Sequence, residues 1–260
     1  DAPDANTITV SNFDTDAGTT ITSVLFDVVP SAAHTVSGIP AGTATVNYGT
    51  SGGTPFDVPA GVTYNTDGTG ALTINVLGDL VTGATRDQAF TVTTSQTLTL
   101  NLGTGINAAS SVDVTSTSLL SLTVTGLAID VTCTPTFANT TALTTVVMSG
   151  MSGPVTATLT DSITSFTGVS GKVNTITGPA TGTGGVAITL GTAADKFHTG
   201  SGDDQVYTIA ATSGADQYHF DSTGTAVATA NIIFSNFDIG TAKVVLPNNI
   251  GLKGLTGVMK

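Results

Sequence analysis

Apolar and polar residues alternate in short runs along the first hundred residues, and Gly, Pro, Asp and Asn separate the runs. A period of two predicts β-strands with one buried face. Six such runs are 7–10, 21–26, 44–48, 61–64, 71–76 and 90–92. Between two of them, Asn65-Thr66-Asp67-Gly68 is typical of a hairpin turn. This spacing predicts an immunoglobulin-like β-sandwich over residues 1–94, with a disordered Thr-rich spacer as the alternative.

From about residue 95 the alternation becomes a loose repeat. Similar apolar and hydroxyl-rich segments occur at 118–126, 141–150 and 161–168. A period of roughly 18–24 residues is the length of one coil of a parallel β-solenoid. Each coil would place Leu, Ile and Val inside and stack Thr and Ser outside, and the solenoid ends would need caps or neighbouring subunits. We therefore expect solenoid-like repeats over 95–189, and an antiparallel sandwich is the alternative.

Composition supports an all-β chain. Thr makes up about a fifth of the 260 residues, and Asp supplies all eighteen acidic side chains because Glu is absent. Thr favours strands, whereas Asp and Gly favour turns, where a carboxylate caps backbone groups or holds a hard cation. Cys133 is the single cysteine, which excludes an internal disulfide, and its strand-like surroundings predict a small buried hydrophobe.

The charge balance limits the classes of partner. Six Lys and Arg against eighteen Asp give a net charge of −12, which excludes a basic nucleic-acid surface. No apolar run approaches the roughly 18–20 residues of a spanning helix. Few lysines, no Trp and many hydroxyls are typical of proteins secreted to bacterial cell surfaces. The opening Asp1 indicates a processed form or a fragment, and the similarity of residues 7–14 to 231–238 suggests one slice of a modular protein.

The most specific pattern lies at 190–220. Residues 199–207 match the nonapeptide G-G-x-G-x-D-x-U-x at Gly200, Gly202, Asp204 and Val206. Residues 190–198 and 211–219 are less complete copies. This stretch, followed by a cap-like segment at 232–247, resembles the RTX family of calcium-binding, type I-secreted bacterial proteins. The Thr-, Ala- and Gly-rich segment at 95–190 looks, more loosely, like the body of RTX-type surface-layer proteins. In the cap, Asn236 stands where the family has Asp.

The resemblance implies a calcium β-roll over residues 190–260. Two nonapeptides make one coil, so Asp195 and Asp216 should lie on one edge and Asp204 on the other. Glycine carbonyls and Asp carboxylates would supply the oxygens that Ca²⁺ prefers. Interior positions fall on Phe197, Val206 and Tyr218. We expect one calcium ion between the Asp195 and Asp216 turns, while a second site near Gly200, Gly202 and Asp204 lacks a same-edge partner. The candidate metal ligands are Asp195, Gly200, Gly202, Asp204, Gly214 and Asp216.

Two alternatives concern the polar residues of this stretch. The acids could cap turns without metal. His198 and His219 hold equivalent positions in two repeats, which raises zinc as a ligand, although solvent-facing strand histidines are the simpler interpretation. His34 stands alone in a predicted loop.

No enzyme pattern accompanies these features. H-E-x-x-H is impossible without Glu, and neither a G-x-S-x-G elbow nor a P-loop occurs. The sequence therefore predicts a non-enzymatic, extracellular structural protein of the bacterial cell surface, which assembles with copies of itself into a calcium-dependent surface layer or filament. A cell-surface polysaccharide would be a further partner, and nucleic acid and membrane insertion are not expected. The alternative function is an RTX-type adhesin module that binds a glycan or a host protein.

Overall fold

The structure is a computed structural model that describes most of the chain. The residues described are 23–26, 34–40, 44–49, 62–76, 86–103, 110–126, 131–181, 184–200, 206–210, 213–220, 231–236 and 241–245. Every regular element among them is a strand, so none is a helix of the length and hydrophobicity that a membrane span requires.

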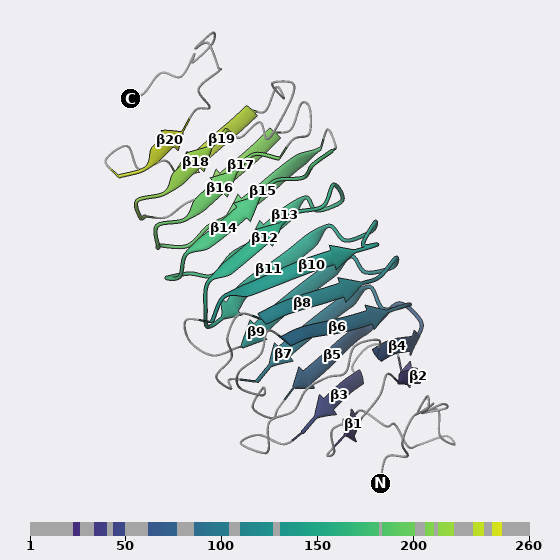
Figure 1. Cartoon of the computed structure of the whole chain (residues 1–260). Coiled ribbons are helices and arrows are strands. Elements are labelled where there is room, and N and C mark those ends of the chain that lie inside the picture. Colours follow the sequence, from purple (N-terminus) through teal and green to yellow (C-terminus); the bar gives the residue numbers. More distant parts are fainter. Residues whose placement is uncertain are drawn as a thin grey trace.

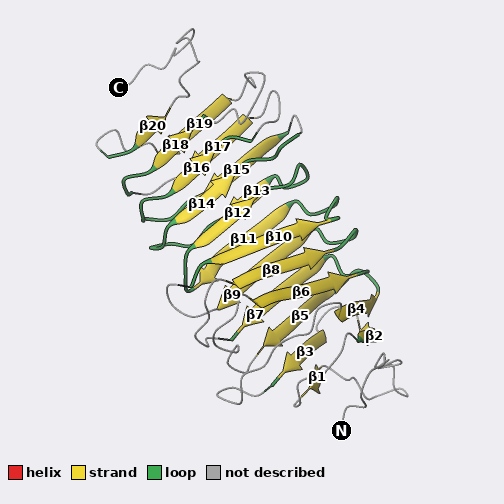
Figure 2. Cartoon of the chain, in the orientation of Figure 1, coloured by secondary structure: helices red, strands yellow, loops and turns green. Residues whose placement is uncertain are grey.

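The strands form two ten-stranded sheets, and successive strands of the chain alternate between them (Figures 1 and 2). The odd sheet contains β1 (Ser23–Phe26), β3 (Ala44–Tyr48), β5 (Ala71–Val76), β7 (Thr97–Leu102), β9 (Ser121–Gly126), β11 (Thr145–Met151), β13 (Ser165–Thr167), β15 (Gly185–Thr189), β17 (Val206–Ala210) and β19 (Asn231–Asn236). The even sheet contains β2 (Thr35–Pro40), β4 (Val62–Asp67), β6 (Arg86–Val92), β8 (Ser110–Thr115), β10 (Cys133–Ala138), β12 (Val155–Thr158), β14 (Asn174–Thr177), β16 (Lys196–His198), β18 (Gln217–His219) and β20 (Lys243–Val245).

Every strand pair in both sheets is parallel. A parallel pair needs a connection that returns the chain to the same end of the sheet, and here the strand of the opposite sheet makes that return. One odd and one even strand therefore make one coil. The molecule is an elongated parallel β-solenoid with the first and last coils at opposite ends (Figure 1).

The core consists of apolar columns that run from coil to coil. In the odd sheet one column is formed by Leu72, Leu98, Leu122, Val146, Phe166, Ile188 and Ile209, all of them buried. In the even sheet Ile176, Phe197 and Tyr218 stack in the same way. Alternate residues of each strand point inward, so the two sheets share one interior.

Polar residues form matching columns outside. On the odd sheet the Asn75 amide donates to Asn47 Oδ1 at 2.8 Å, and the Asn101 amide donates to Asn75 Oδ1 at 2.6 Å. The Thr125 hydroxyl extends this ladder to Asn101 Oδ1 at 2.7 Å. Hydrogen bonds between identical side chains of adjacent coils stabilise the same register as the buried columns.

The solenoid prediction for 95–189 is confirmed, and parallel pairing also reaches toward the N-terminus. The three repeat segments contribute β9, β11 and β13, which are neighbours in the odd sheet. The immunoglobulin-like sandwich over residues 1–94 is not shown. The strands described there, β1 to β6, pair in parallel within the same two sheets, whereas a sandwich of that type needs antiparallel pairs. Residues 7–10 lie outside the described part.

The predicted hairpin at Asn65–Gly68 is wrong. Residues up to Asp67 belong to β4, which pairs with β2 and β6, while the following strand β5 pairs with β3 and β7. Gly68 has a φ of 104°, so the turn uses a glycine conformation, but it carries the chain from one sheet to the other.

Truncation of the odd-sheet column should separate core packing from surface effects. We expect Phe166→Ala to lower the free energy of unfolding by about 3–5 kcal/mol, because it opens a cavity between Val146 and Ile188. Thr167→Ala, the next residue and on the outer face, should change it by no more than about 0.5 kcal/mol. Urea denaturation followed by circular dichroism measures both. Equal losses in the two variants would contradict the assigned inward and outward faces.

Candidate functional site

A column of buried polar residues marks the C-terminal part of the even sheet. Asn174 begins β14, Asp195 immediately precedes β16, and Asp216 immediately precedes β18. The three residues are 21 positions apart and occupy equivalent places in successive coils. Asn174 and Asp195 are fully buried, and Asp216 is 2% exposed. We call these residues the polar ladder.

Asp195 has hydrogen-bond donors at both carboxylate oxygens. Its Oδ1 accepts from the Asn174 backbone N–H at 2.6 Å and from the Asn174 side-chain amide at 2.9 Å. Its Oδ2 accepts from the Gly191 N–H at 3.1 Å. Asn174 is itself fixed, because its Oδ1 accepts from the Val169 N–H at 2.8 Å and its amide donates to the Val169 carbonyl at 3.0 Å. The Asp195 carboxylate thus satisfies backbone donors of two coils.

Asp216 continues the ladder by one coil. Its Oδ1 accepts from the Asp195 N–H at 2.9 Å, and its Oδ2 lies 3.4 Å from the Tyr218 hydroxyl. The Asp195 carbonyl in turn accepts from the Gln217 N–H at 2.8 Å. Each acid therefore connects its own turn to the preceding coil.

Burial dominates the electrostatics of the ladder. It raises the pKa of Asp195 to about 6, and the nearby Asp216 carboxylate acts in the same direction, while the N–H donors from Asn174 and Gly191 act against it. Burial also raises the pKa of Tyr218, and Asp216 adds to that increase. The coil interior disfavours charge at this point, so proton uptake by Asp195 is linked to folding.

The predicted shared edge of Asp195 and Asp216 is confirmed by their place in adjacent coils. The atoms around Asp195 fit the turn-cap alternative better than a calcium ligand. Calcium takes six to eight oxygen ligands. The two Asp195 oxygens together accept hydrogen bonds from three N–H groups. The positive ends of these N–H dipoles point at the carboxylate and disfavour a cation there.

The glycines of the predicted site have separate structural roles. Gly200 donates its N–H to the Tyr207 hydroxyl at 3.2 Å, and a Cβ there would lie 1.7 Å from the Pro179 carbonyl oxygen. Gly214 has a φ of 124°, and its carbonyl accepts from the Thr241 hydroxyl at 2.8 Å. Gly202 and Asp204 lie outside the described residues, so the calcium site predicted around them stays a prediction.

The interior positions are confirmed at Phe197 and Tyr218, which are buried. The choice of Val206 is wrong. In β17 the buried residues are Tyr207 and Ile209, and Val206 lies on the other face of the strand. The Tyr207 ring packs edge-on against Phe197 at a centroid distance of 4.9 Å.

The histidines fall into two environments. His198 and His219 are in register on β16 and β18, and their rings stack 4.4 Å apart on the outer face of the even sheet. His34 is buried rather than isolated in a loop. Its Nε2 lies 3.0 Å from the Tyr48 hydroxyl, which lies 2.7 Å from the Tyr64 hydroxyl. This buried cluster was not predicted from the sequence, because its members come from three separate segments, 14 and 16 residues apart.

Cys133 is buried as predicted, and burial raises the pKa of its thiol to about 12. In the part of the chain that the structure covers, no three His, Cys, Asp or Glu side chains gather in a group that could hold a metal ion. Comparisons of this chain with protein-family models, with curated proteins and with solved structures find no match.

The raised pKa of Asp195 predicts a pH-dependent stability difference. A folded-state pKa of about 6 against an ordinary value of 3.8 means that the folded protein binds the proton more tightly. The stabilisation that proton binding at Asp195 gives to the fold is therefore fully present below about pH 4 and is lost as the pH rises through 6. The free energy of unfolding falls by at most about 3 kcal/mol for this reason. The free energy of unfolding of the wild type minus that of Asp195→Asn should fall over this range.

Asp161→Asn serves as the control, because Asp161 lies in an exposed turn where its carboxylate accepts from Thr181. Its difference curve against the wild type should lack this fall. Urea denaturation at half-unit steps from pH 4 to 7 provides the measurement. Difference curves of equal slope for the two variants would show that Asp195 does not carry the proton linkage.

Proposed function

We propose that this chain is an extracellular structural protein that assembles with copies of itself into a surface layer or filament. The support comes from the ends of the solenoid, where large apolar side chains are exposed. Leu25 on β1 is 55% exposed, Ile233 on β19 is 54% exposed and Val244 on β20 is 41% exposed. Central coils bury nearly all side chains of this kind, so the terminal coils are suited to contact with another subunit.

The three side chains differ in orientation. Leu25 and Ile233 lie on the outer face of the odd sheet, because they pair with Asn47 and with the exposed Thr208. Val244 pairs with the buried Tyr218, so it continues an interior column at the last strand of the even sheet. At the first strand of the odd sheet, Val24 and Phe26 pack against the core but are only partly buried. A solenoid cannot complete its own terminal columns, and a cap or a neighbouring copy must cover them. Stacking of one copy's last coil on the next copy's first coil would continue both sheets and the core.

End-to-end stacking of this kind is heterologous, because two different surfaces meet, and it produces open filaments. We therefore expect Val244→Asp to shorten assemblies markedly, since it places a charge in the contact. Val173→Asp is a matched control, because Val173 is 39% exposed in a turn midway along the stack. Negative-stain electron microscopy gives the length distributions. Equal shortening in both variants, or in neither, would contradict end-to-end stacking.

The resemblance of residues 190–247 to RTX proteins supports secretion to a bacterial cell surface and a role for calcium. The remaining candidate for calcium is the segment from Thr199 to Asp204, which the sequence pattern predicts as a turn, since the donors around Asp195 favour a cap. A cation that binds the folded turn and not the unfolded chain stabilises the fold by mass action. At about 100 times its dissociation constant the gain is about 2.7 kcal/mol.

Removal of calcium tests this part of the proposal. We expect EGTA to lower the melting temperature and to release subunits, and excess calcium to reverse both effects. Asp204→Asn should lose most of the calcium response, whereas Asp161→Asn should keep it. Unchanged melting and assembly in EGTA would reject calcium dependence. Dispersed particles that bind glycans at every calcium concentration would instead favour the adhesin function.

A further inference from the structure

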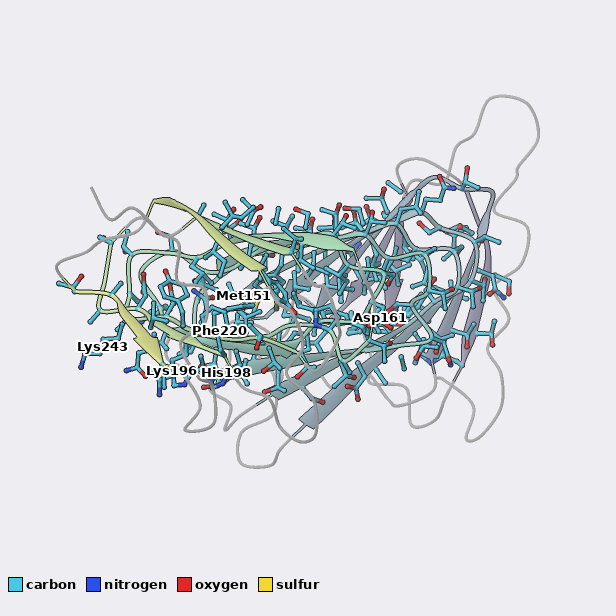
Figure 3. The ribbon with its side chains drawn as sticks, turned by 90° about the horizontal axis from the view of Figure 1, so that it is seen from above. Met151, Asp161, Lys196, His198, Phe220 and Lys243 are labelled. Atoms are coloured by element: carbon cyan, nitrogen blue, oxygen red, sulfur yellow. The ribbon has the colours of Figure 1, made fainter. Side chains whose placement is uncertain are left out.

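The outer face of the even sheet carries opposite charges on separate strands, with basic residues on the last three strands and an acidic residue on β8, the fourth of its ten strands. Near the C-terminal end, Lys196, Gln217 and Lys243 are in register on β16, β18 and β20. His198 and His219 form the parallel column beside them. We call these five residues the basic strip. Figure 3 shows Lys196, His198 and Lys243 on one side of the molecule near that end.

The opposite charge lies on β8. Asp113 stands between the buried Val112 and Val114, so its carboxylate is on the outer face of the same sheet. It is paired across the strands with Thr136, whose hydroxyl donates to its carboxylate. This residue and the basic strip are separated by the middle strands of the sheet.

The middle of this face is uncharged and regular. Its outward positions on β10, β12 and β14 are Thr134, Thr136, Ala138, Thr156, Thr158, Thr175 and Thr177. The threonines of β10 and β12 are exposed, and those of β14 are half-buried. Short side chains of equal length form a level surface on which a second sheet can lie closely, at the spacing of about 10 Å that stacked sheets adopt.

We propose that this face binds the same face of a second copy in antiparallel orientation. A two-fold axis through the threonine surface would place the basic strip of each copy over Asp113 of the other. Such an interface is isologous, with one self-complementary patch on both subunits. Charge complementarity at both ends would fix the orientation, because a parallel arrangement would oppose like charges. The proposal rests on self-association, as the proposed function does, but it uses a sheet face and not the terminal coils.

The size of the face sets the expected affinity. From β8 to β20 the sheet extends six strand spacings of about 4.8 Å, and its strands are three to six residues long. Two such faces would bury about 600–1,200 Å² in total, which is the range of weak or transient contacts. We therefore expect a dimer that forms at tens to hundreds of micromolar and weakens as salt screens the charges.

Charge exchange tests the arrangement. With Val244→Asp present in every protein to remove the terminal contact, sedimentation equilibrium at low salt should show that Lys196→Asp with Lys243→Asp weakens dimerisation at least tenfold. Asp113→Lys should do the same. The triple variant combines all three substitutions, so the two patches again carry opposite charges with their signs exchanged. It should regain most of the affinity. Asp161→Lys makes the same charge change as Asp113→Lys in an exposed turn, and it should dimerise like the wild type.

Several outcomes would overturn the proposal. One is a Val244→Asp protein with the sheet face unchanged that stays monomeric at low salt up to several hundred micromolar. Another is a triple charge variant that fails to recover dimerisation while circular dichroism shows it folded. If monomeric wild type bound alginate and the double lysine variant did not, the basic strip would serve an acidic polysaccharide instead. Filament length measures the terminal-coil contact separately. If the Val244→Asp variant forms shorter filaments but still dimerises, the terminal coils and the sheet face are two separate contacts.

Discussion

Hydrogen bonding from each coil to the next is the constraint on which the other features depend. Every strand is parallel to its neighbours, so equivalent residues of successive coils lie in line across each sheet. Leu98, Leu122 and Val146 are aligned inside, and Asn47, Asn75 and Asn101 are aligned outside. A residue that suits one coil must therefore also suit the residues above and below it. Among the described strands, the first and last of each sheet pair on one side only, so the same rule leaves their columns open there.

The polar ladder shows how this constraint treats acidic residues. Asn174, Asp195 and Asp216 stand at the start of even strands, where backbone N–H groups donate to the ladder carboxylates. A short carboxylate reaches such groups within its own turn and in the coil below, and Glu would add one methylene to that reach. Burial makes the arrangement sensitive to protonation, as the raised pKa of Asp195 indicates. The hydrogen bonds of the ladder thus stabilise the stack, while the desolvation of its carboxylates opposes this effect.

The sequence was most informative where coil lengths are nearly constant. Between 118 and 168 the repeats are 20–24 residues apart, and the solenoid was predictable there. Asn47 and Asn75 are 28 residues apart, so insertions in the turns hide the same repeat near the N-terminus. Alternation cannot distinguish parallel from antiparallel pairing, since both have a period of two. The spacing of Asp195 and Asp216 predicted a shared edge. The same spacing fits both an inward-facing carboxylate and an outward-facing one, so it could not predict their burial. Val206 was chosen from the nonapeptide pattern, yet β17 buries more apolar surface through Tyr207 and Ile209.

The regular register of the central coils has a consequence for the length of the molecule. Leu98 pairs with Leu122, and Leu122 pairs with Val146, at identical intervals. Loss or duplication of one interval would leave the flanking residues matched to partners of the same kind, both inside and outside. Gene-level gain or loss of such a unit would change the molecule by one strand spacing, about 4.8 Å, and leave the remaining pairs as they were. The solenoid can thus act as a molecular ruler whose extent evolves in discrete increments.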